Sequence, residues 1–161
     1  MKKSMGFSIA AIVLTALYAL ACVEIFANGA LVYEMFGLPV RDTLLDPSLF
    51  YGLGVRIFLN VLLVLLFAVG ALLCNPRTEK NNTELILLVL AVVFQCLQPV
   101  CNIIASSYET VVIARTRGAE YLAAYSTMIN MVNLAGMLLT VANAMALLQI
   151  GINYGRKKKN Q

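Results

Sequence analysis

Histidine and tryptophan are absent from the 161 residues of this chain, and only 12% of the residues are charged. Without histidine there is no imidazole to act as a general base or to ligate haem or zinc. The four cysteines show neither the C-x-x-C spacing of thiol redox sites nor that of metal knuckles. No stretch carries a nucleotide-binding or catalytic signature. We therefore expect no cofactor and no bound metal, and a membrane enzyme is the weakest of the functional hypotheses.

Hydrophobic residues, in contrast, make up 61% of the chain and fall into four long runs. About twenty apolar residues suffice to cross the hydrocarbon core of a bilayer as a helix. The sequence therefore predicts an all-α, polytopic membrane protein that forms a single four-helix transmembrane bundle with short loops. The predicted spans cover residues 7–28, 52–74, 84–106 and 122–150.

The ends of these spans depend on local signals. Asp46-Pro47 is a favourable N-cap and first-turn pair, so the second span can begin before residue 52. The fourth span is predicted to stop between Gly151 and Gly155, before a basic tail at residues 156–161. Residues 107–121 contain a TVVIAR run that is compatible with a helical extension or with a short strand.

Basic residues lie mainly on one side of a four-span arrangement. That side holds Lys2, Lys3, Arg77, Lys80, Arg156, Lys157, Lys158 and Lys159. The opposite loops hold Arg41, Arg115 and Arg117. The positive-inside rule then predicts a multi-pass protein of the cell membrane with both termini in the cytoplasm. The bilayer is the expected partner of these charges, and no nucleic acid is expected.

A secretory signal is the alternative interpretation of the first span. Lys2 and Lys3 precede an apolar stretch, and Ala19-Leu20-Ala21 before Cys22 resembles a small-residue cleavage site. Cleavage would leave three spans. Apolar character resumes after Glu24, which a signal peptide does not need, and this favours an uncleaved first span.

Polar residues recur inside the spans at helical spacing. In the fourth span they are Ser126, Asn130, Asn133, Thr140 and Asn143; in the third Gln95, Gln98, Asn102 and Ser106; in the second Arg56 and Asn60; and in the first Ser8, Thr15 and Cys22. Intervals of three, four or seven residues place each set on one helix face. Four such faces predict one polar-lined interior.

Depth separates these residues further. With a rise of about 1.5 Å per residue, Glu24, Arg56 and Asn102 lie roughly 10 Å from the midplane on the non-cytoplasmic side. Glu24 and Arg56 are therefore predicted to face each other or to share a hydrated pocket. We expect a pocket open to the non-cytoplasmic side, with Glu24, Arg56, Asn60, Gln98, Asn102, Asn130 and Asn133 as candidate ligand-binding residues.

Two functions fit this pattern. The pocket can bind or transport a small polar or cationic ligand, with Glu24 as the acidic contact. Alternatively, the chain is a non-catalytic accessory or assembly subunit whose polar faces are satisfied by a membrane-protein partner or by further copies of itself. Single amides often serve only as hydrogen-bonded links between membrane helices, and Arg56 alone can snorkel toward the interface.

Overall fold

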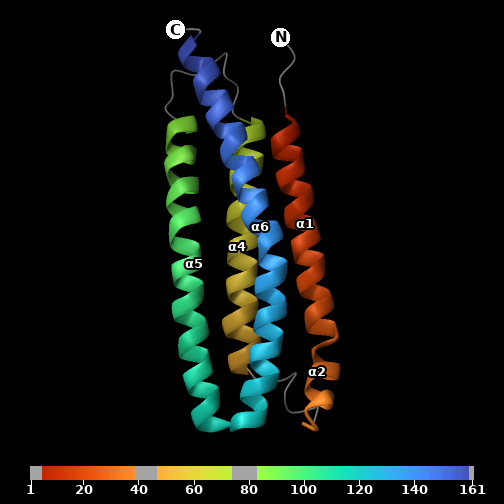
Figure 1. The fold of residues 1–161 in the computed structure, drawn as a ribbon. Coiled ribbons are helices and arrows are strands. Elements are labelled where there is room, and N and C mark those ends of the chain that lie inside the picture. Colours follow the sequence, from red (N-terminus) through yellow and green to blue (C-terminus); the bar gives the residue numbers. More distant parts are fainter. Residues whose placement is uncertain (1–4, 39–46, 74–82, 160–161) are drawn as a thin grey trace.

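A computed structural model describes residues 5–38, 47–73 and 83–159, and within them every regular element is a helix. The elements are α1 (Gly6–Ala27), α2 (Gly29–Met35), α4 (Pro47–Leu73), α5 (Thr83–Thr116) and α6 (Ala119–Lys159) (Figure 1). Four of them, α1, α4, α5 and α6, are long and apolar enough to cross a membrane. The predicted all-helical class is confirmed, with four helices of membrane-spanning length, and these suggest a multi-pass membrane protein.

The helix ends refine the predicted spans. The helix α4 begins at Pro47, where the fixed φ of proline suits a first turn. The Asp46 cap lies outside the described residues. The helix α5 continues to Thr116, so the TVVIAR run is a helical extension and not a strand. Gly118, with a φ of +96°, then turns the chain into α6, because glycine adopts this backbone conformation without steric cost.

The fourth helix continues beyond the predicted end of the fourth span. The helix α6 passes through Gly151 and Gly155 and ends at Lys159. A glycine inside a helix costs only about 1 kcal/mol relative to alanine, and the residues that follow Gly155 are good helix formers. The basic residues at the end of the chain therefore begin as a helical extension of the fourth span.

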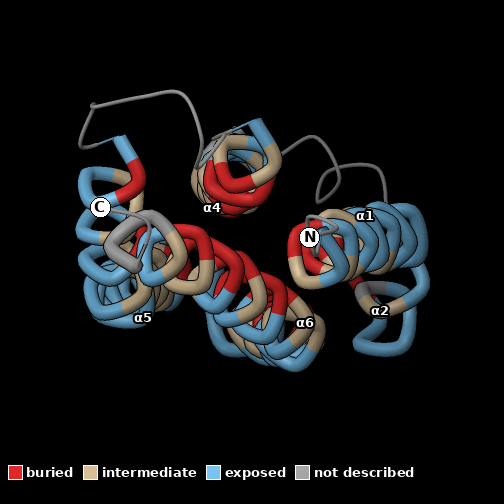
Figure 2. Tube along the Cα trace, turned by 90° about the horizontal axis from the view of Figure 1, so that it is seen from above, coloured by how far each residue is buried: buried red, intermediate tan, exposed pale blue. Residues whose placement is uncertain are grey.

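The helix α6 is the central element of the bundle. It contacts α1, α2, α4 and α5, whereas α1 and α5 do not contact each other. The first turn of α1 and the last turn of α6 lie at the same end of the bundle (Figure 1). Seen from above, the buried faces of α1, α4 and α6 point toward a common centre (Figure 2).

Among the described residues, the two larger of three clusters of buried side chains hold the long helices together. One contains Tyr18, Val64, Tyr125 and Leu139. The other is rich in alanine, with Ala11, Ala68, Ala71, Ala91 and Ala146. Small residues allow membrane helices to approach closely. Large apolar side chains such as Ile86 and Leu97 instead point outward, as suits a surface covered by lipid.

Candidate functional site

A cavity of about 430 Å³ lies between α4, α5 and α6, with Tyr18 of α1 also in its wall. Its polar lining residues are Tyr18, Arg56, Asn60, Gln98, Asn102, Ser106, Ser107, Asn133 and Thr140. Helical spacing explains why they meet, because Arg56 and Asn60 are one turn apart on α4, as are Gln98, Asn102 and Ser106 on α5. We call this cavity the polar pocket.

Five of the seven predicted ligand-binding residues line the polar pocket: Arg56, Asn60, Gln98, Asn102 and Asn133. Glu24 and Asn130 do not line it, and both are exposed on the surface of the bundle. The structure thus brings together the predicted residues of α4 and α5 and one of the two from α6. Their role in binding a ligand stays a prediction.

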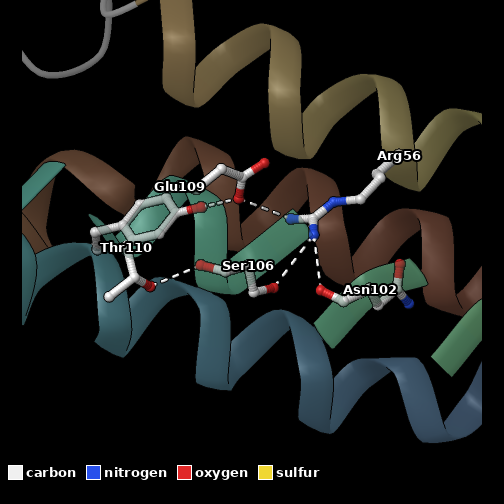
Figure 3. Close-up of polar contacts among 6 residues, drawn as sticks. Arg56, Asn102, Ser106, Glu109 and Thr110 are labelled. Atoms are coloured by element: carbon white, nitrogen blue, oxygen red, sulfur yellow. Dashed lines mark hydrogen bonds and ion pairs between the residues drawn. The ribbon is translucent and has the colours of Figure 1, made fainter. Parts of the chain in front are cut away.

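Arg56 is the centre of the hydrogen bonds at one end of the polar pocket (Figure 3). Its Nη2 lies 3.0 Å from Oε2 of Glu109, and its Nη1 donates to the Asn102 carbonyl and to Ser106 Oγ, each at 3.2 Å. The Tyr125 hydroxyl donates to the same carboxylate oxygen of Glu109. The two charged side chains are 18% and 16% exposed, so this end of the pocket carries a neutralised ion pair.

The predicted contact between Glu24 and Arg56 is wrong. Arg56 pairs with Glu109, and Glu24 accepts a hydrogen bond from Nδ2 of Asn28, one turn further along the chain, at 3.3 Å. The reason is the length of α5. Its three extra turns carry Glu109 into the bundle, whereas the sequence had placed it in a loop. The spacing Gln98, Asn102, Ser106, Glu109 was a signal that the same helix face continues.

Gly52 makes room for this ion pair. A Cβ atom at Gly52 would lie 2.6 Å from Oε1 of Glu109, which is closer than real Cβ contacts allow. The absence of a side chain at this position of α4 therefore lets the carboxylate of α5 fit beside the neighbouring helix. At Gly54, in contrast, a Cβ would meet no atom within 4 Å.

The polar pocket opens sideways, between α5 and α6. Its lining residues from α1 and α4 are buried or half-buried. Its exposed lining residues all come from the other two helices: Pro99, Ile103 and Ser107 from α5, and Asn133, Met137 and Thr140 from α6. Ile103 and Met137 are 67% and 64% exposed. The pocket thus has an inner wall in which Arg56 and Asn60 lie among aliphatic side chains such as Leu53, and a mixed rim that faces outward along the bundle.

The charged end of the pocket lies near one end of the apolar helix segments. Arg56 follows the start of the apolar segment Gly52–Leu73 by four residues, which is about 6 Å along the helix. A bilayer that covers this segment would hold Arg56 close to its boundary with water, where a charge costs less than at the centre.

A second group of polar side chains lies outside the polar pocket and links the helices directly. Asn143 of α6 donates to the side-chain oxygen of Gln95 on α5. Gln149 donates to Asn153 at 3.1 Å, and Asn153 donates to the Ala71 carbonyl of α4 at 2.9 Å. Gln149 and Asn153 extend the polar face of α6 beyond the predicted stripe, and the sequence reading missed them. The amides of Asn143 and Asn153 therefore serve as hydrogen-bonded links between helices.

The chemistry available in the polar pocket is hydrogen bonding by amides, hydroxyls and a neutralised guanidinium. Within residues 5–38, 47–73 and 83–159, no three metal-ligating carboxylate or thiolate side chains come together. The arrangement can therefore hold and orient a polar group without presenting a net charge to it. No family model matches this chain, and comparisons with curated proteins and with solved structures found none that is similar to it.

Proposed function

We propose that this chain is a membrane protein that binds a small molecule in the polar pocket through hydrogen bonds. The observation that carries the proposal is the contrast between two kinds of amide. Asn143 and Gln95 bond directly to each other, whereas Asn60, Gln98 and Asn133 line open space. The cavity volume falls in the range of about 300–1,000 Å³ that is usual for ligand sites.

The proposed ligand has a polar group without net charge. A cationic ligand would need an available acid, but Glu24 does not line the polar pocket and Glu109 is bound by Arg56 and Tyr125. An anionic ligand would have to compete with Glu109 for Arg56. An uncharged group that both donates and accepts hydrogen bonds meets neither difficulty.

The proposal includes an orientation. Both termini face the cytoplasm of a cell, and the Arg56 end of the pocket faces the opposite side of the cell membrane. The distribution of lysine and arginine in the sequence supports this arrangement.

A ligand screen by thermal unfolding of the purified protein tests the function. At a concentration of 100 times its Kd, a ligand that binds only the folded state stabilises it by about 2.7 kcal/mol. We expect Asn133→Leu to abolish the shift caused by any stabilising compound and Asn130→Leu to retain it. Asn130 is the matched control, because it lies on the same helix, is exposed and does not line the pocket. Equal shifts in both variants would contradict the proposal.

An accessory role in a membrane complex is the second candidate. The observation that favours it is the exposed amide of Asn130 within the apolar part of α6, because polar groups that face lipid without a partner are costly. A neighbouring transmembrane helix would satisfy this amide. Co-purification of a membrane protein in fixed stoichiometry, lost in Asn130→Leu, would support this role.

A further inference from the structure

A second hollow, of about 620 Å³, lies between α5 and α6 on the other side of the Gln95–Asn143 hydrogen bond. It is lined by Leu88 and Val92 of α5 and by α6 residues between Ala144 and Ile152. All of its lining side chains are aliphatic or absent. We call it the apolar hollow.

The apolar hollow and the polar pocket follow each other along one seam. On α5 the lining residues Leu88, Val92, Pro99 and Ile103 are separated by four, seven and four positions. On α6 the corresponding residues are Asn133, Thr140, Ala144 and Gly151, at intervals of seven, four and seven. These intervals keep each set on a single helix face. The polar pocket and the apolar hollow therefore lie on the same faces of α5 and α6, so the seam is polar near Arg56 and apolar beyond the Gln95–Asn143 hydrogen bond.

The length of the seam matches a membrane lipid. Leu88 and Asn102 are fourteen residues apart on α5, which corresponds to about 21 Å along the helix. The hydrocarbon core of a bilayer is about 30 Å thick. A molecule with a polar head at Arg56 would thus reach the apolar hollow with a long hydrocarbon chain that runs along the helices.

Two glycines keep the seam open. Gly136 lines the polar pocket, Gly151 lines the apolar hollow, and a Cβ atom at either position would meet no atom within 4 Å. Exposed residues such as Ile103 and Met137 form the rim. A molecule that diffuses in the bilayer can therefore enter sideways without crossing the aqueous phase.

We infer that the seam binds a membrane lipid with an uncharged, hydroxyl-bearing or amide-bearing head. The head occupies the polar pocket, and one hydrocarbon chain lies along the apolar hollow. A neutral head fits better than a phosphate, because Glu109 already neutralises Arg56 and a phosphate would compete with it. This inference rests on the proposed function and adds the class of the ligand.

Photo-crosslinking in nanodiscs tests the inference. The probe is monooleoylglycerol with a diazirine in its hydrocarbon chain, and mass spectrometry locates the labelled residues. We expect labelling of α5 and α6 in the apolar hollow. Gly151→Leu fills the hollow, and the loss of contact with about two methylene groups should weaken labelling about tenfold. Gly54→Leu is the control, because this position also has open space but lies on α4, away from the seam.

The outcomes separate the inference from the function on which it rests. Equal labelling of the wild type, Gly151→Leu and Gly54→Leu would mean that the probe is only surrounding lipid, and would overturn the inference. A different pattern would show that the pocket binds a soluble molecule. In that case Gly136→Leu abolishes thermal stabilisation by a water-soluble ligand, whereas Gly151→Leu changes neither that stabilisation nor the labelling by the lipid probe. The lipid inference would then fail while the proposed function stands. Stronger labelling by a diazirine-bearing phosphatidylglycerol would overturn the assignment of a neutral head. Gly151→Val, with its smaller side chain, should give intermediate labelling and guards against misfolding of the leucine variant.

Discussion

Arg56 and Glu109, which are 53 positions apart in the sequence, are joined by a contact of 3.0 Å between Nη2 and Oε2 that links α4 to α5. The guanidinium also bonds to the backbone and side chain of α5, at Asn102 and Ser106. Asn102 and Ser106 thus hold the guanidinium, and Tyr125 holds the carboxylate, so both charges have the additional hydrogen bonds that a structural ion pair requires.

Neutralising one member of this pair should cost more than neutralising both. Arg56→Gln leaves an unpaired carboxylate, and Glu109→Gln leaves an unpaired guanidinium, so each should lower the free energy of unfolding. The cost should stay below the about 3–5 kcal/mol seen for fully buried pairs, because both side chains keep some exposure. The double variant should recover part of the loss. Chemical unfolding in mild detergent measures the free energy of unfolding of all three variants. Glu24→Gln, at an exposed position, is a near-neutral control. If the loss in the double variant equals the sum of the two single losses, the two charges are not coupled.

The glycines of α4 provide a second prediction. Gly52→Ala should force the Glu109 carboxylate to move, because the new Cβ would lie 2.6 Å from its Oε1. Gly54→Ala meets no neighbouring atom and should be neutral, or stabilising by up to about 1 kcal/mol through helix propensity. Thermal unfolding should therefore rank Gly54→Ala above Gly52→Ala. The ranking should disappear when both variants are made in the double variant Glu109→Gln, Arg56→Gln. There the side chain at position 109 is no longer held by an ion pair and can move away from the new Cβ atom.

The hydrogen bond between Asn143 and Gln95 should show coupling of its own. Each apolar single variant leaves one amide without its partner: the half-buried Gln95 in Asn143→Leu and the buried Asn143 in Gln95→Leu. Coupling between polar side chains in membrane helices averages about 0.6 kcal/mol and reaches about 1.7 kcal/mol. Oδ1 of Asn143 is already buried without a partner in the structure, so the double apolar variant should lose less than the sum of the singles. Additive losses in a double-mutant cycle would show that the two amides act independently.

Topology is tested by reporters that are active only in the cytoplasm. Fusions at Gln161 and near Lys80 should be active, and fusions near Asp42 and Arg117 should be silent. The reason is that most basic residues lie on the same side of the membrane as Lys80 and Gln161, which the positive-inside rule assigns to the cytoplasm. An active fusion near Asp42 would reverse the proposed orientation. A cleaved signal would appear separately, as a mature protein that lacks the residues before Cys22.

The sequence predicts the helices better than their rotation. Apolar length alone identifies four spans, because a bilayer sets the length that a spanning helix needs. Rise per residue then gives the depth of Glu24 and Arg56 but not the direction in which each points. Equal depth therefore did not imply contact. Asn130 and Asn133 illustrate the same limit, since three positions rotate a side chain enough for one to line the polar pocket and the other to be exposed.

The Glu109 position shows a different limit. Charged and hydroxyl residues lower the apolar character of the last turns of α5, so hydropathy ends the span near Ser106, although the helix continues to Thr116. Helical periodicity of the polar residues, followed past the apolar boundary, was the usable signal. Gly52 was beyond sequence reasoning, because its importance depends on which residue of a distant helix packs against it.

The central place of α6 has a consequence for biosynthesis. This helix leaves the ribosome after α1, α2, α4 and α5, yet it contacts all of them, and α1 and α5 do not contact each other. Membrane helices insert first and associate afterwards. Until translation passes residue 119, the earlier spans can form only the α1–α4 and α4–α5 contacts, and Gln95 and Tyr18 lack their neighbours on α6. The complete bundle therefore assembles only once α6 has been synthesised, and a chain truncated before α6 lacks the contacts that join α1 and α5 to the same helix.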